Sequence, residues 1–258
     1  MKLHCIGDSH TAFFTGYDKI QSEYPEIVFS IVSNILTYRI GAPLAFNLCE
    51  KVSKENSNKK LFAILKSLNI QEDFILLCFG EIDCRAHIIK QAEITNKSIE
   101  EVIENCINRY VSVVLEIKKM GFRVGVWNAI PSAIGINNPN SEFPYYGKDL
   151  ERNIVTKKFN ERLAFFSINN QFNYWQIFDL LVDENLKTRE KYYFDKVHLN
   201  SKLLPITLSK IVKDLPMLNF RKQDIFKIKF QIFSSFLRKN KYFNILYSLY
   251  AKLKKSVN

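Results

Sequence analysis

Glycine, proline and cysteine are scarce in this 258-residue chain, which contains 8 Gly, 7 Pro and 5 Cys. The low glycine and proline content excludes a collagen-like or proline-rich scaffold. A hydrophobic content of 47% with 24% charged residues excludes wholesale disorder. The chain has no internal repeat, which excludes a solenoid or a propeller. These absences favour a globular protein that is long enough to bury a full core.

Long apolar runs and metal-type or disulfide-type cysteine patterns are also missing. No window approaches the roughly 18 consecutive apolar residues of a membrane-spanning helix, and residues 1–8 contain no stretch of signal-peptide length. The cysteines show neither paired nor zinc-type spacing; they are Cys5, Cys49, Cys78, Cys84 and Cys106. We therefore expect a reduced, cytoplasmic protein with small core cysteines and no metal or cofactor.

Positive charge is concentrated at one end of the chain. The whole sequence carries a net charge of +11, but residues 219–258 alone contain ten Lys or Arg and a single acid, Asp224. That segment has a net charge of +9, so residues 1–218 are nearly neutral at +2. We predict an α/β domain over residues 1–215 and a basic helical appendage over residues 216–258.

Strands and helices alternate along the first part of the chain. Apolar runs predict about five buried strands, at residues 2–6, 27–32, 74–79, 122–127 and 174–178. Helical periodicity covers residues 61–68, 98–120, 150–168 and 201–212. Ser98 and Glu101 have capping-box spacing at the start of the helix 98–120, and Gly121 is suited to its end. This alternation predicts a parallel sheet with helices on both faces, which binds ligands at the carboxyl ends of its strands.

Polar segments follow two of the predicted strands, each directly after a glycine. The first reads Gly-Asp-Ser-His at residues 7–10, and the second reads Gly-Glu-Ile-Asp-Cys-Arg at residues 80–85. A serine hydroxyl becomes a good nucleophile only when a base removes its proton. Ser9 therefore needs a histidine partner, and the chain contains His4, His10, His87 and His198.

His198 is the best candidate for this base. It follows Asp195 by three residues, so one loop supplies both an acid and a base. The carboxylate can orient the imidazole and stabilise its charged form while the other ring nitrogen faces the serine. His4 lies within the first strand and is predicted to be a core or strand-facing residue, and His10 adjoins Ser9 but is predicted to lack a nearby orienting acid. We predict a catalytic group of Ser9, His198 and Asp195.

These segments resemble the SGNH hydrolases, also called GDSL-type esterases. Residues 7–10 resemble the family block that holds the nucleophile, and Asp195-x-x-His198 resembles the block that holds the acid and base. The resemblance covers about residues 1–215 and implies a flavodoxin-like α/β/α sandwich. It also implies hydrolysis or transfer of an acyl group without a cofactor, and it leaves acyl-CoA open as a donor.

The resemblance further suggests residues of the oxyanion hole and the substrate site. Gly41 matches a glycine whose backbone N–H binds the oxyanion, although a simple turn glycine is the alternative. The family pattern Gly-x-Asn-Asp occurs here at residues 80–83 with Ile82 in place of asparagine, and loss of one oxyanion donor costs roughly 10²–10³ in rate. The candidate oxyanion and substrate residues are Gly41, Asp8, Gly80, Asp83 and Arg85.

Two side chains near Ile82 could replace the missing donor. They are Arg85 and His87, both of which carry N–H groups. The alternative for Arg85 is an ion pair with Glu81 or Asp83 that organises the loop.

Residues 219–258 alternate apolar and basic stretches, which predicts two amphipathic helices broken near Asn240. Basic helices with aromatic faces commonly lie on anionic membrane surfaces. Docking of the apolar face on the domain itself or on a second copy is the alternative. We expect no nucleic-acid binding, because no recognised motif accompanies the charge.

Together these features predict a serine-dependent acyl-ester hydrolase or O-acyltransferase. The expected substrate is an acylated carbohydrate such as a surface glycan precursor, and the expected location is the cytoplasm or the inner face of the membrane. Two alternatives remain open. One is a non-catalytic SGNH-like domain that binds a glycan or a partner, which Ile82 motivates; the other is a lipid ester or thioester hydrolase.

Overall fold

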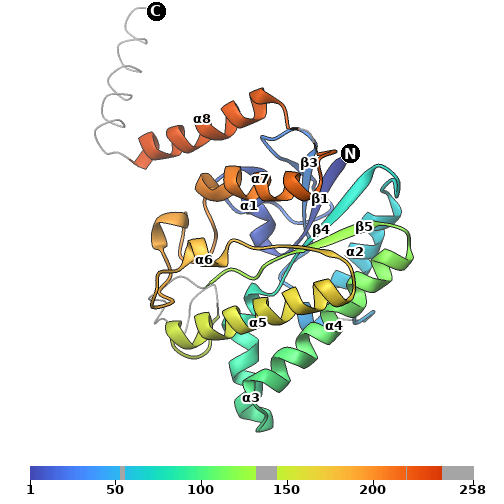
Figure 1. The fold of residues 1–258 in the computed structure, drawn as a ribbon, viewed down its shortest axis with the longest axis vertical. Helices are drawn as coiled ribbons and strands as arrows, with labels where there is room; N and C mark the ends of the chain where they lie inside the picture. The colour runs from blue at the N-terminus through green and yellow to red at the C-terminus, as the bar shows by residue number, and fades with distance from the viewer. Residues whose placement is uncertain (53–55, 132–143, 219, 240–258) are drawn as a thin grey trace, which may run out of the picture.

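The computed structural model describes residues 1–52, 56–131, 144–218 and 220–239. Its centre is a six-stranded sheet in the order β2-β3-β1-β4-β5-β6 (Figure 1). The strands are β1 (Lys2–Gly7), β2 (Val28–Phe29), β3 (Ile35–Arg39), β4 (Asp73–Cys78), β5 (Arg123–Trp127) and β6 (Asn173–Trp175). All neighbouring strands are parallel except β2, which pairs antiparallel with β3. The predicted α/β class is confirmed.

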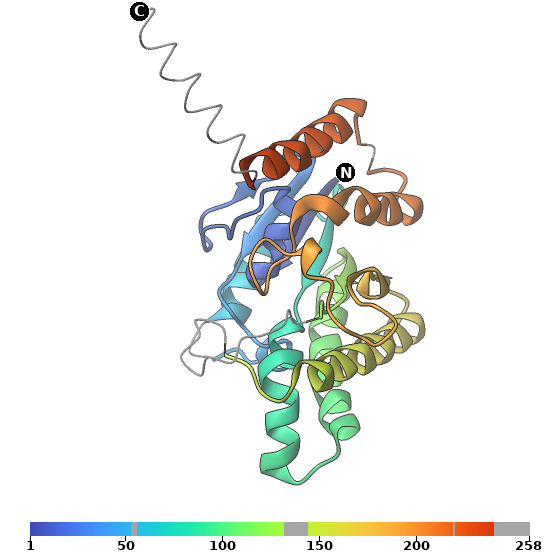
Figure 2. The same ribbon diagram turned by 90° about the vertical axis from the view of Figure 1, so that its left-hand side faces the viewer.

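Helices cover both faces of this sheet and form the outer layers of the fold (Figures 1 and 2). One face is packed by α2 (Ser57–Lys66), α3 (Ile88–Thr95), α4 (Ile99–Lys119) and α5 (Asp149–Asn169). The other is packed by α1 (Ala12–Thr15), α6 (Phe178–Leu181), α7 (Leu204–Asp214) and α8 (Lys222–Lys239).

Strand β4 shows why the buried strands read as continuous apolar runs. Its side chains alternate between the two cores: Phe74 and Leu76 face one, and Ile75 and Leu77 face the other. Since helices cover both faces, neither set can be polar. His4 of β1 is a buried polar exception, and its ring nitrogens have polar partners: they contact the Tyr38 hydroxyl at 2.9 Å and Asp73 at 3.0 Å.

Helix α4 begins and ends as its sequence predicts. The Ser98 hydroxyl accepts from the Glu101 N–H, and the Glu101 carboxylate accepts from the Ser98 N–H, which completes the capping box. Gly121 follows the helix with a φ of +95°, a conformation that favours glycine.

The strand predicted at residues 27–32 is wrong in extent and direction. Only Val28–Phe29 pairs, antiparallel at the sheet edge, and the Phe29 side chain is 71% exposed. The strand beside β1 is instead β3, and Gly41 follows it. The apolar run was misleading because β-branched residues also occur in exposed edge segments.

The cysteines lie where small core residues were expected, whereas the structure describes only part of the predicted appendage. All five cysteines are free; Cys49 is half-buried and the others are buried. The first predicted appendage helix is α8, whereas the second lies outside the described residues. Within the part of the chain that the structure describes, no helix is long and apolar enough to cross a bilayer.

Buried Asp224 attaches α8 to the domain. Its carboxylate accepts hydrogen bonds from the backbone N–H and hydroxyl of Ser33, at 3.1 and 2.9 Å, and from the Arg221 N–H at 3.0 Å. Ile228, one turn further along, is also buried in the core. Helix α8 is therefore packed against the α/β domain by one polar and one apolar anchor.

Replacement of this polar anchor should loosen α8. We expect Asp224→Ala to accelerate trypsin cleavage after Lys227 and Lys229 roughly tenfold or more, because hydrogen bonds to a buried carboxylate are lost. Mapping of the cleavage sites by mass spectrometry measures this, with the exposed Gln223→Ala as the control. Equal cleavage rates in both variants would contradict the assigned role of Asp224.

Candidate active site

Ser9 lies at the carboxyl end of β1, at the start of the 3₁₀ helix η1 (Ser9–Thr11). Asp8 caps this helix, since its carboxylate accepts from the His10 N–H at 2.8 Å. A Cβ on Gly7 would lie only 2.2 Å from the backbone oxygen of Cys78, so glycine is required where β1 passes β4. This local structure leaves Ser9 half-buried, just beyond the carboxyl end of β1.

Ser9, His198 and Asp195 are joined by a continuous chain of hydrogen bonds. The Ser9 Oγ lies 2.7 Å from His198 Nε2, and His198 Nδ1 lies 2.7 Å from Asp195 Oδ2. Ser9 comes from the first strand exit, 189 residues before His198. The structure therefore brings together the three residues that the sequence assigns to one catalytic group.

The loop that carries Asp195 and His198 is fixed by its own backbone. The Asp195 carboxylate accepts from the N–H groups of Val197 and His198, at 2.7 and 2.6 Å. The Phe194 N–H donates to the His198 carbonyl, and the Phe194 ring stacks on the imidazole with centroids 5.7 Å apart. These contacts hold the imidazole in one orientation toward Ser9.

The charges of this pair suit a base and its orienting acid. Burial lowers the pKa of His198, Asp195 opposes that shift, and the charge of the nearby His10 lowers the pKa further. Burial would raise the pKa of Asp195, but hydrogen bonds from His198 outweigh it and lower that pKa. The imidazole is consequently neutral and able to accept a proton at neutral pH.

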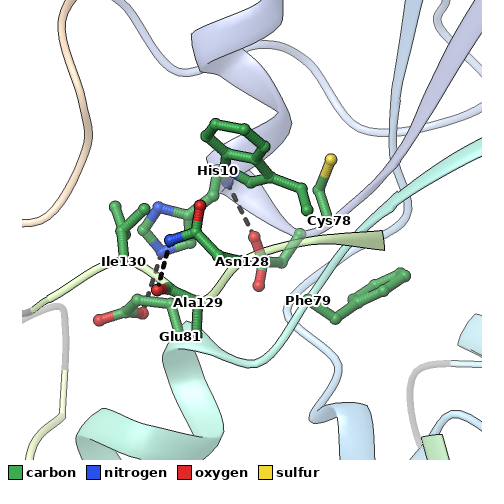
Figure 3. Close-up of a pocket in the computed structure, with 9 residues that line it drawn as sticks. His10, Cys78, Phe79, Glu81, Asn128, Ala129 and Ile130 are labelled. Carbon is green, nitrogen blue, oxygen red and sulfur yellow. Dashed lines mark hydrogen bonds and ion pairs between the residues drawn. The ribbon is translucent and has the colours of Figure 1, made fainter. Parts of the chain in front are cut away.

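A second, buried group of charged residues lies beside the first. His10 Nε2 is 2.9 Å from Glu81 Oε2, and Arg85 Nε donates to Glu81 Oε1 at 2.7 Å. The His10 and His198 rings are tilted against each other with centroids 4.9 Å apart. Figure 3 shows His10 and Glu81 converging from their separate chain segments. This buried charged group therefore adjoins His198.

Charge compensation within this group decides its protonation. Burial would lower the pKa of His10, but Asp8 and Glu81 raise it overall, which favours the imidazolium. Burial would raise the pKa of Glu81, but Arg85 and His10 bring it down to about 2. Burial raises the pKa of Asp8 to about 6, with His10 acting in the opposite direction. The charges of His10 and Glu81 are therefore maintained by their neighbours, whereas burial disfavours the charge of Asp8.

The small cavity beside this group, drawn in Figure 3, is about 10 Å³ in volume. Asp8, His10, Glu81 and Asn128 are among its lining residues. Such a volume fits about one water molecule, so this cavity is too small for an acyl ester. Among the described residues, no group of three or more His, Cys, Asp or Glu could hold a metal.

Gly41 follows β3 and lies beside β1, the strand that leads to Ser9. It follows β3 with a φ of +112°, and the preceding Ile40 N–H donates to the Gly7 carbonyl at 2.9 Å. The loop after Gly41 is held by Asp83, whose carboxylate accepts from the N–H groups of Ala45 and Phe46 at 2.7 and 3.1 Å. Asp83 is fully buried, and these two hydrogen bonds support the loop that follows Gly41.

Gly80 also has a structural reason to be glycine. Its φ is +110°, and a Cβ there would lie 2.8 Å from the Phe159 ring of α5. The Arg85 side chain is buried and engaged with Glu81 and with the Pro144 carbonyl. The structure therefore shows the ion pair that was the alternative for Arg85. His87 is half-buried and packs on Phe46, with centroids 5.1 Å apart.

Sequence reasoning missed the pairing of His10 with Glu81, and the statement that His10 lacks an orienting acid is wrong. The acid lies 71 residues away along the chain. A signal was available, because each residue follows a glycine at the end of a predicted strand. Only the order of strands, with β1 beside β4, shows that the two exits meet.

Glu81 should stabilise the fold in a pH-dependent way. Its pKa is about 2 when folded and about 4.3 when unfolded. The stabilisation is therefore complete above about pH 4.3 and is lost as the pH falls toward 2. We expect Glu81→Gln to lower the free energy of unfolding by about 3 kcal/mol at pH 7.

Urea unfolding at several pH values measures this effect, and the difference from the wild type should shrink below pH 4. Glu104→Gln is the matched control, because it breaks a half-exposed Glu–Arg pair with Arg162 and should cost less than about 1 kcal/mol. A pH-independent loss in Glu81→Gln would disagree with the assigned pKa.

Comparison with known proteins supports the fold. No protein-family model matches the chain, and no curated protein is significantly similar in sequence. Among solved structures, Est24, a carbohydrate acetylesterase from Sinorhizobium meliloti, matches with a TM-score of 0.52 and 14% identity over 84% of this chain and 99% of its own. The aryl esterase of M. smegmatis matches with a TM-score of 0.51 and 12% identity, over 83% and 99%. Together with the strand order and the motifs at residues 7–10 and 195–198, these similarities show that the chain has the SGNH hydrolase fold.

Proposed function

We propose that the protein is an SGNH-type ester hydrolase in which Ser9, His198 and Asp195 form the catalytic triad. The hydrogen-bonded chain from Ser9 Oγ through the imidazole to the Asp195 carboxylate carries this proposal. Its geometry suits a nucleophile, a general base and an orienting acid. The half-buried position of Ser9 supports access by a substrate.

In the proposed mechanism, His198 Nε2 takes the Ser9 proton as Oγ attacks the acyl carbon. The carbonyl oxygen becomes an oxyanion, and the imidazolium then gives its proton to the leaving alcohol, which produces acyl-Ser9. His198 next removes a proton from water, which attacks the acyl group and releases the acid and free Ser9. Asp195 stabilises the imidazolium in both steps.

The proposed oxyanion hole consists of the Ser9 and Gly41 N–H groups. Ser9 begins a helix, and the first N–H groups of a helix have no intrahelical partner. Gly41 is adjacent to β1 through the Ile40–Gly7 hydrogen bond, and Asp83 supports its loop. With Ile82 at the usual asparagine position, these two donors carry the oxyanion without the third one.

His10 is proposed to set the pH range of the base. Its ring pairs with Glu81 and lies next to the His198 ring, and the charges of Asp8 and Glu81 raise its pKa. A positive charge at this distance disfavours protonation of His198, so more of the free enzyme is ready to act as a base in mildly acidic solution. Asp195 and Glu81 are the charges that oppose this effect.

For the substrate, we propose an acylated carbohydrate. The similar fold of Est24, a carbohydrate acetylesterase, supports an acetylated sugar. Attack on acyl-Ser9 by a sugar hydroxyl instead of water would make the protein an O-acyltransferase, with acyl-CoA as a candidate donor. The five free cysteines support a reduced cytoplasmic setting.

A non-catalytic glycan-binding domain is the second candidate function. Ile82 favours it, because an aliphatic side chain cannot donate to an oxyanion. The two candidates differ in the reactivity of Ser9.

Ser9 should react covalently with a serine-directed phosphonate. We expect an adduct on Ser9 in the wild-type protein, and hydrolysis of a short activated ester that falls by about 10⁴-fold or more in Ser9→Ala and His198→Asn. Intact mass and peptide mapping measure the adduct, and the exposed Ser112→Ala serves as the control. Silence of the wild type in both assays, with acyl-CoA supplied as an alternative donor, would favour the binding domain.

Removal of the His10 charge should shift the acid limb of the pH–rate profile. Because His10 lowers the pKa of His198, His10→Gln should move the acid limb of kcat/KM to higher pH. The control His87→Gln should leave the limb where it is. A limb that stays in place, or that moves to lower pH, in His10→Gln would exclude this electrostatic coupling.

A further inference from the structure

Helix α8 presents an aromatic face on the side turned away from the domain. Asp224 and Ile228 are buried against the domain, whereas Phe226, Phe230 and Phe233 are 69%, 62% and 57% exposed. The rings of Phe226 and Phe230 stack on each other with centroids 6.5 Å apart. Figures 1 and 2 show α8 at the outer edge of the molecule. The helix thus has one face in the core and a second apolar face in solvent.

The spacing of these residues places the two faces opposite each other. At about 100° per residue, the three phenylalanines fall within a sector of about 60°, roughly half a turn from Asp224 and Ile228. Lys227 and Lys229 are exposed and lie on the two sides of this sector. We call Phe226, Phe230 and Phe233 with these two lysines the outer face of α8.

A monomeric soluble protein rarely exposes three neighbouring aromatic rings without a use for them. Packing on the domain does not account for them, because Asp224 and Ile228 already provide that contact. Aromatic rings flanked by long cationic side chains are typical of helices in a membrane interface, where the rings enter the acyl boundary and the lysines reach the headgroups.

We propose that the outer face of α8 binds the surface of an anionic lipid bilayer. Residues 219–258 carry a net charge of +9, with Lys241, Lys252, Lys254 and Lys255 beyond α8. This charge complements anionic headgroups. It also disfavours pairing of two copies through the same face, since two strongly positive segments would be brought together. The proposal does not depend on the proposed hydrolase function.

Anchoring by Asp224 gives this attachment a consequence for the whole protein. Because α8 is packed on the α/β domain through Ser33 and Ile228, a bilayer bound to its outer face also holds the domain close to the membrane. A substrate carried on a lipid would then be concentrated near the domain without a membrane-spanning helix.

Vesicle co-sedimentation of the full chain tests the proposal. We compare phosphatidylcholine vesicles with vesicles that contain phosphatidylglycerol as well, at low and high salt. Wild-type protein should bind the anionic vesicles and be released by salt. Lys227→Glu/Lys229→Glu should weaken binding by at least about 25-fold, since each lysine near the surface contributes about fivefold. Phe226→Ser/Phe230→Ser/Phe233→Ser should abolish it.

Matched variants elsewhere keep the test specific. Phe29→Ser/Ile168→Ser changes two apolar side chains that are at least as exposed, at 71% and 76%, and Lys66→Glu/Lys119→Glu reverses two exposed charges. Both should bind like the wild type, and circular dichroism should show that all variants are folded. Ser9→Ala should also bind fully, which separates this proposal from catalysis.

Three outcomes would overturn the proposal. One is absence of wild-type binding to the anionic vesicles. Another is wild-type binding to the neutral phosphatidylcholine vesicles that equals binding to the anionic vesicles and persists at high salt. The third is a dimer in sedimentation velocity that dissociates in the triple phenylalanine variant, because the outer face would then be an interface between copies.

Discussion

The parallel pairing of β1 with both β3 and β4 is the constraint on which the rest of the site depends. Gly7 at the end of β1 lies opposite Arg39 on one side and Cys78 on the other. The segments that follow β1, β3 and β4 therefore meet at the carboxyl ends of these strands, and they carry Ser9, Gly41 and Glu81 respectively. Because Gly7 has no side chain, β1 and β4 approach each other closely at their carboxyl ends, where Gly7 contacts the Cys78 carbonyl. Parallel strands place such exits together because their carboxyl ends share one side of the sheet.

Two groups of polar and charged side chains lie at the carboxyl ends of these strands. Ser9, His198 and Asp195 form a chain with access to solvent at Ser9 and Asp195, whereas His10, Glu81 and Arg85 are buried. The buried group is balanced internally, because Glu81 pairs with both cations. Isolated charges would be very costly to bury. Their mutual compensation lets the positive imidazole of His10 lie next to His198 and lower the pKa of His198.

Local sequence patterns predicted the parts of this architecture that are themselves local. The capping box of α4, the apolar run of β4 and the spacing of Asp195 to His198 each depend on residues close together in the chain. Strand β3 was missed because Thr37 and Arg39 interrupt its apolar pattern. The pairing of His10 with Glu81, and the support of the Gly41 loop by Asp83, depend on strand order and loop placement, which the periodicity of one segment does not encode.

In the proposed site, the backbone N–H groups of Ser9 and Gly41 bind the oxyanion formed at Ser9, although Ile82 replaces the usual donor. A crystal structure of the phosphonate adduct tests it most directly, because the adduct resembles the tetrahedral intermediate. We expect phosphorus bonded to Ser9 Oγ, with one phosphoryl oxygen about 2.7–3.1 Å from the Ser9 and Gly41 nitrogens. A phosphoryl oxygen directed away from Gly41, or an adduct on another residue, would contradict it.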